Sequence, residues 1–226
     1  MKHFQDDVSF EVRWLPFQLN PQASKTGISK VPITRSQTTS PCVLVVLESL
    51  RPLTPLPFYK VKMYQDKFGK SEQEVFEMAE RMKANFAAAG LPYVFTHDGL
   101  TGNTFNAHRL LTWAGQKSLE TQDQVAEALF RSYFAEEKFP NDPEVLVAAA
   151  VEAGLDVAEA RAFVEDESAL ADETTKELHI SRLYQVRGVP FFVLSEGEGD
   201  DAKKLALSGA QPPAQFVEAL NQLSQE

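Results

Sequence analysis

The first side chain to consider is a thiol, because the 226 residues include one cysteine, Cys42. Thiol–disulfide exchange needs a thiolate of lowered pKa and a second thiol that resolves the mixed disulfide. No second thiol is present, and the residue three positions after Cys42 is Val45. A single cysteine also excludes an internal disulfide framework and a cysteine-rich metal site. We therefore interpret Cys42 as structurally incidental and predict no catalytic residue in this chain.

The best candidate for binding is the loop at Val189 and Pro190, within residues 185–194. The pattern predicts the end of a helix, a tight loop and then a strand of aromatic and β-branched residues. A glycine, an apolar residue and a proline can hold a cis peptide bond before the proline. The backbone of Val189 would then be exposed and could pair with an extended peptide or with glutathione. In the alternative interpretation, Pro190 only shapes a turn ahead of a buried strand.

A second candidate lies at Asn103, Thr104 and His108. Asn103 or Thr104 is typical of a helix N-cap, and Thr104 and His108 are four residues apart, so they face the same way. The alternative is an N-cap pair beside a solvated histidine. We predict no metal site, because the other histidines lack metal-ligand spacing; they are His3, His97 and His179. No phosphate-binding loop and no nucleophile elbow is present.

The composition argues against several classes of partner. The net charge is −10, the pI is about 5.0, and no basic cluster is present, which argues against nucleic acid. No apolar run approaches the length that spans a membrane. Residues 1–7 lack the apolar core of a signal peptide. We therefore expect a cytoplasmic protein without a membrane partner.

The elements that must position these residues can be predicted from periodicity and capping. Residues 8–17 alternate apolar and polar side chains, which predicts a strand with one buried face. Ser71 and Glu74 form a capping box. Predicted helices run over residues 71–90, from Asn103 or Thr104 onward, and over residues 121–136, 145–151, 156–165 and 168–184. After Pro190 we predict a strand, a hairpin tip over residues 195–204, a strand over residues 205–209 and a last helix over residues 212–223.

The sequence resembles the DsbA-like thioredoxin-domain proteins, most of all their FrnE branch. The motifs that carry the resemblance lie in residues 8–21, 64–69, 103–110, 188–190 and 208–212. The resemblance implies an α/β, thioredoxin-like fold with an inserted α-helical subdomain. In the family the proline of the Gly-Val-Pro loop is cis and faces the redox cysteines. The helix that begins at Asn103 borders the same site, so Thr104 and His108 could bind a thiol or a carboxylate.

The chain departs from the family pattern in two places. A first strand and a helix with Cys-x-x-Cys should precede residue 8, and we expect both to be missing. Residues 22–62 form an irregular insertion, with residues 31–60 as its core and translated intron sequence as one explanation. Alternatively, the apolar residues 43–47 substitute for the first strand. We divide the single domain, 1–226, into a thioredoxin part (8–21 and 185–226), this insertion, and a helical subdomain (63–184).

Three functions are consistent with these observations. The first is a thiol–disulfide oxidoreductase of the DsbA/FrnE type, impaired because the cysteine pair is absent. The second is a relative that uses glutathione for isomerase or transferase chemistry, and the third is a non-catalytic protein that binds peptides or a partner. The expected partner is a thiol- or disulfide-bearing peptide or glutathione, with no other cofactor. Without the family's central first strand, we expect marginal stability or aggregation.

Overall fold

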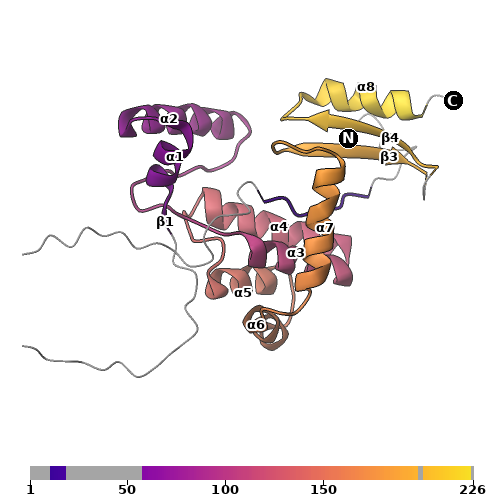
Figure 1. Ribbon diagram of the computed structural model, residues 1–226, viewed down its shortest axis with the longest axis horizontal. Coiled ribbons are helices and arrows are strands. Elements are labelled where there is room, and N and C mark those ends of the chain that lie inside the picture. The colour runs from indigo at the N-terminus through magenta and orange to yellow at the C-terminus, as the bar shows by residue number, and fades with distance from the viewer. Residues whose placement is uncertain (1–10, 19–57, 198–200, 225–226) are drawn as a thin grey trace, which may run out of the picture.

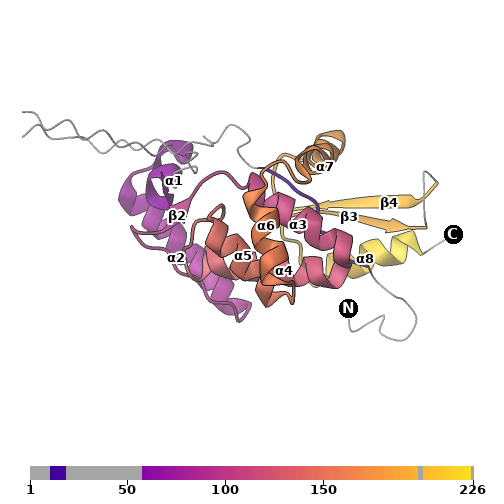
Figure 2. The same ribbon diagram turned by 90° about the horizontal axis from the view of Figure 1, so that it is seen from below.

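The computed structural model of the chain describes residues 11–18, 58–197 and 201–224 (Figure 1). Helices account for most of these residues: α3–α6 lie in the middle, α1 and α2 at one side, and two longer strands form a hairpin with α8 at the other (Figures 1 and 2). The helices are α1 (Lys60–Phe68), α2 (Glu72–Ala88), α3 (Phe105–Lys117), α4 (Leu119–Phe134), α5 (Pro143–Glu152), α6 (Val157–Glu165), α7 (Ala171–Leu183) and α8 (Pro213–Leu223). The strands are β1 (Phe58–Tyr59), β2 (Leu100–Thr101), β3 (Phe191–Glu196) and β4 (Lys203–Ser208).

Local capping explains where several helices begin. The Ser71 hydroxyl accepts a hydrogen bond from the Glu74 amide at 3.3 Å, and the Glu74 carboxylate accepts one from the Ser71 amide at 2.8 Å. This confirms the predicted capping box of α2. Asp142 and Asp156 cap α5 and α6, so α5 begins two residues before the predicted start at residue 145. Ser118, which the prediction did not use, caps α4 by accepting from the Thr121 amide at 2.9 Å.

The hydrophobic core lies among α3, α4, α5 and α6. Its fully enclosed side chains include Leu110, Val125 and Leu146, each at most 1% exposed. Alanines at the helix contacts, such as Ala114 and Ala150, let the backbones approach closely. Trp113 and Phe163 close the α3–α6 side with stacked rings 4.7 Å apart. The core of the molecule is therefore helical rather than built on a sheet.

The strands β3 and β4 form an antiparallel hairpin that carries α8 on one face (Figure 2). Phe192 pairs with Leu207 across the hairpin, and its ring meets the ring of Phe216 from α8 edge-on at 4.9 Å. Lys203 and Lys204 belong to β4, so the predicted hairpin tip over residues 195–204 is too long. The order strand, hairpin, strand, helix agrees with the prediction for this part of the chain.

The strand predicted over residues 8–17 is wrong where it can be checked, because residues 11–18 contain no strand. Val12, predicted to be on the buried face, is 48% exposed. The backbone N–H and C=O of Trp14 are bonded to the side chain of Gln122 instead of to a neighbouring strand. Periodicity alone could not reveal this, since the pairing partner is a helical side chain.

The predicted insertion and its alternative lie largely outside the described residues. Within residues 22–62, residues 58–62 belong to β1 and the first turn of α1, so this end of the stretch is regular. Cys42 and the apolar run 43–47 lie outside the described residues. The division into a thioredoxin part, an insertion and a helical subdomain stays a prediction.

Candidate functional site

The loop at Val189 and Pro190 connects α7 to β3. The Val189–Pro190 peptide bond is cis. The carbonyl of Pro190 accepts a hydrogen bond from the amide of Gly209 at 2.8 Å, which ties the loop to the end of β4. Val189 is 49% exposed and Pro190 is exposed as well. The loop is thus fixed on one side and open to solvent on the other.

The N-terminus of α3 brings together the three other predicted residues. Thr104 is the N-cap of α3, and its carbonyl accepts from the His108 amide at 3.0 Å. Asn103 is buried, and its side-chain oxygen accepts from the Phe105 amide at 2.8 Å. The hydroxyl of Thr104 makes no capping hydrogen bond. The sequence predicted either Asn103 or Thr104 as the capping residue. Thr104 holds the N-cap position, and the side chain of Asn103 makes the hydrogen bond to the helix.

His108 is held as a neutral ring. Its Nε2 atom lies 3.1 Å from the carbonyl oxygen of Phe17, and because a carbonyl only accepts, Nε2 carries the hydrogen. Burial lowers the pKa of His108 to about 4, although the bond to Phe17 acts in the opposite direction. The ring therefore has a bare acceptor at Nδ1, which is buried and has no hydrogen-bond partner in the described part of the chain. The alternative of a solvated histidine is wrong.

Helix α7 links the two candidate groups. It packs against α3 through Thr112, whose hydroxyl donates to Glu177 at 2.7 Å and accepts from Thr174 at 3.3 Å. From there α7 runs to the start of β3, where the proline loop lies (Figure 1). Among the described residues, no hydrogen bond, ion pair or ring contact joins Val189 or Pro190 to Thr104 or His108. The five predicted residues thus form two groups. One lies at the start of α3, and the other lies in the loop that follows α7.

Arg109 is a buried residue that the sequence interpretation passed over. It is fully buried, and its guanidinium donates to the carbonyls of Ala169 at 2.8 Å, Phe163 at 3.4 Å and Asp166. Burial is the main cause that lowers its pKa. These bonds fix the connection from α6 to α7, and so the direction in which α7 approaches the proline loop. Its burial could have been predicted from its position between Ala107 and Leu110, on the apolar side of a predicted helix.

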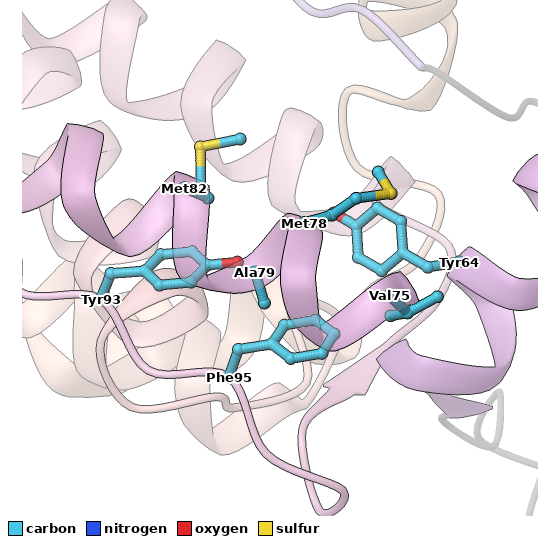
Figure 3. A pocket seen from close by; sticks show the side chains of 7 residues that line it. All are labelled: Tyr64, Val75, Met78, Ala79, Met82, Tyr93 and Phe95. Atoms are coloured by element: carbon cyan, nitrogen blue, oxygen red, sulfur yellow. The ribbon is translucent and has the colours of Figure 1, made fainter. Parts of the chain in front are cut away.

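A small cavity lies between α1, α2 and the following loop, away from both candidate groups. Its volume is about 50 Å³, room for one or two waters rather than a substrate. Burial raises the pKa of Tyr64 and raises that of Tyr93 to about 12, so both hydroxyls stay protonated. Figure 3 shows its lining residues: Tyr64, Val75, Met78, Ala79, Met82, Tyr93 and Phe95. We interpret it as a packing defect of the α1–α2 hairpin.

Two other kinds of site, a metal site and a membrane span, have no candidate within the described residues. No group of three or more His, Cys, Asp or Glu side chains there has the geometry to hold a metal ion. In the same residues, no helix is long and apolar enough to cross a membrane.

Comparison with known proteins gives a consistent result. The family model described as "DSBA-like thioredoxin domain" matches residues 2–221. Among solved structures, the chain is similar to a probable DsbA oxidoreductase from Streptomyces coelicolor, with 32% identity and a TM-score of 0.63. That match covers 74% of this chain and 68% of the other. A search of curated proteins gave no match. The predicted thioredoxin-like α/β fold with added helices is confirmed.

Proposed function

The chain belongs to the family of DsbA-like thioredoxin domains, and from this premise we propose that it binds a thiol- or disulfide-bearing peptide or glutathione. The proposed site has two separate parts, the loop at Val189 and Pro190 and the start of α3 with Asn103, Thr104 and His108, and an extended ligand would have to reach from one to the other. Val189 would offer exposed backbone to an extended ligand. As part of the proposal we assign the chain to the FrnE branch and to the cytoplasm, where a single reduced cysteine is usual.

The observation that carries this proposal is the neutral ring of His108 with its unpartnered Nδ1. A bare ring nitrogen accepts a hydrogen bond, and a thiol S–H can donate one. Because Nδ1 is buried, the ligand thiol would reach it by displacing the atoms that cover it. A carboxylate cannot donate, so Nδ1 favours a thiol over a carboxylate. Of the two ligand groups considered from the sequence, we therefore propose the thiol.

We further propose that these 226 residues do not complete disulfide exchange by themselves. In that reaction a thiolate attacks one sulfur of a disulfide, the other sulfur leaves as a thiolate, and a second thiol releases the mixed disulfide. The two electrons come from a pair of thiols that ends as a disulfide. With one cysteine in the sequence, Cys42, the chain cannot form that pair internally. Binding without turnover is the expected behaviour.

The test is a calorimetric titration of the 226-residue chain with reduced glutathione and with S-methyl glutathione, which has no S–H. We expect the methylated ligand to bind about tenfold more weakly, the effect of one buried hydrogen bond lost. His108→Leu should remove that difference, and His179→Leu, on the exposed side of α7, should keep it. Equal binding of both ligands would exclude the thiol contact.

An insulin-reduction assay on the same chain tests the missing turnover. We expect no reduction above the background of the dithiol reagent alone, because the chain supplies no pair of thiols. Catalytic reduction by the chain would contradict the binding-only proposal.

A further inference from the structure

Gln122 of α4 holds the backbone of another segment at both of its polar groups. Its side-chain oxygen accepts from the Trp14 amide at 3.0 Å, and its side-chain nitrogen donates to the Trp14 carbonyl at 3.1 Å. The same nitrogen donates to the carbonyl of Leu111 at 3.2 Å, which fixes the amide against α3. Gln122 is 2% exposed. One buried amide thus replaces the pair of bonds that a neighbouring strand would make.

The surface of α3 is shaped to let this side chain pass. Gly115 lies inside α3, where glycine is unfavourable. A Cβ at Gly115 would lie 2.7 Å from the side-chain nitrogen of Gln122, closer than real Cβ contacts allow. The missing side chain of Gly115 therefore leaves the space that the side-chain amide of Gln122 occupies. Gln122 and Gly115 together form a preformed binding site for an extended backbone.

Other contacts around the Gln122 side chain make the site selective for the residues of the bound segment. The indole N–H of Trp14 donates to Asp123 at 2.8 Å, and its ring meets Phe130 edge-on at 5.4 Å. One residue earlier, Arg13 pairs with Glu177 at 3.1 Å. Three residues after Trp14, the carbonyl of Phe17 accepts a hydrogen bond from His108. The face of α3, α4 and α7 thus binds backbone, indole and guanidinium groups of one segment.

We propose that this face is a receptor for an extended peptide with a central aromatic residue, and that residues 11–18 are its tethered occupant. The segment has no secondary structure of its own, and Val12 and Leu15 are 48% and 45% exposed. Pro16 is buried, and Trp14 and Phe17 are half-buried, so one side of the segment faces α3, α4 and α7 while Val12 and Leu15 face solvent. The receptor goes beyond the proposed function, because it uses backbone and ring contacts and no thiol.

The tether explains why the chain's own segment fills the site. The segment and the receptor belong to one chain, so their binding is intramolecular, with an effective concentration that can reach about 1 mM. An outside peptide must compete with that concentration. The receptor becomes available when the tethered segment leaves.

The test uses the full chain and a free peptide with the sequence of residues 11–18. Trp14→Pro removes the amide hydrogen and the indole from the tethered segment and leaves α3 and α4 unchanged. We expect Trp14→Pro to bind the peptide about tenfold more tightly than the parent chain, because the tethered competitor is disabled. Methylating the tryptophan amide of the peptide should weaken binding about tenfold, since the Gln122 oxygen loses its donor.

A matched pair of variants locates the receptor. In the Trp14→Pro chain, Gln122→Ala should weaken peptide binding about tenfold or more, while Gln124→Ala, exposed on the same helix, should leave it unchanged. If Trp14→Pro does not bind the peptide at millimolar concentration, or if the Gln122 and Gln124 variants bind alike, the receptor does not exist. The peptide contains no cysteine, so its binding does not use the proposed thiol contact at Nδ1 of His108, although its phenylalanine carbonyl would bond to Nε2 of the same ring.

A measurement on the parent chain covers the case in which Gln122→Ala fails to fold. Hydrogen exchange by NMR should show the Trp14 amide protected about tenfold or more relative to the same residue in the free peptide. A Trp14 amide that exchanges at the free-peptide rate would overturn the proposal.

Discussion

The helical unit α3–α6 and the sheet unit of β3, β4 and α8 bury their apolar side chains to different extents. In the helical unit, Leu110, Val125 and Leu146 are at most 1% exposed. In the sheet unit the buried apolar residues are Ala219 and Leu223, both on α8. Each helix of the first unit has neighbours on several sides, whereas α8 covers one face of a two-stranded hairpin. The helical unit supplies its own core, and the sheet unit does not.

Part of the exposed apolar surface lies on and next to the sheet unit, while other exposed apolar side chains, such as Leu91 and Val157, lie elsewhere. Leu183 at the end of α7 is 82% exposed, Val189 is 49% exposed, and Val193 of β3 is 37% exposed. Within the described residues, β3 pairs with β4 alone and offers its other edge. The proposed substrate loop belongs to this surface. The part of the molecule that carries the loop is therefore the part with the least internal stabilisation.

Core substitutions should show the largest difference between the two units. Leu110→Ala is expected to lower the free energy of unfolding by about 2 to 5 kcal/mol, through lost burial and a residual cavity. Val193→Ala, at a partly exposed strand position, should cost less than about 1 kcal/mol. Urea unfolding followed by circular dichroism measures both. Equal losses would mean that β3 is buried by something other than β4 and α8, and the comparison would fail.

The buried guanidinium of Arg109 is the next test. Arg109→Met should lower the free energy of unfolding by about 3 kcal/mol, because the carbonyls of Phe163, Asp166 and Ala169 lose their donor inside the protein. The control is Arg161→Met, which breaks an exposed ion pair with Glu144 and should leave the unfolding midpoint near that of the parent. A small loss for Arg109→Met would show that water replaces the guanidinium.

Local signals explain why many of the helices could be predicted from the sequence. The capping residues Ser71, Asp142 and Asp156 act on amides two or three residues away, so their effect lies inside a short window. The hairpin after Pro190 was found for the same reason, since its two strands are adjacent in the chain. The limits of elements were less certain, as Lys203 and Lys204 of β4 show.

Distant contacts explain what could not be predicted. The strand assigned to residues 8–17 failed because the polar groups of Trp14 bind Gln122, a residue far along the chain and on a helix. The hydrogen bond of His108 depends on the carbonyl of Phe17, and the role of Arg109 depends on carbonyls in the α6–α7 connection. None of these pairings leaves a periodic trace. The sequence placed the candidate residues on their elements but could not show which of them meet.

His108 ties the stability of the helical unit to pH. Its pKa is lowered to about 4, below the ordinary value of 6.5, so between these values the unfolded chain binds more protons than the folded one. Stability should therefore fall as the pH is lowered, by about 2 kcal/mol between pH 7 and pH 5 from this residue. Urea midpoints across that range measure the slope. His108→Gln should flatten it, and His179→Gln should not; parallel slopes for all three chains would contradict the burial of the ring.

The smallest effect on stability is expected at Leu183. Because this side chain is 82% exposed, Leu183→Lys should change the free energy of unfolding by less than about 0.5 kcal/mol. It should nevertheless slow aggregation, measured by light scattering on heating, because it places a charge among the exposed apolar side chains at the end of α7. Leu183→Ile keeps the surface apolar and should aggregate like the parent. If Leu183→Lys aggregates equally fast, this surface does not drive association, and the exposed apolar groups of the sheet unit do not limit the solubility of the chain.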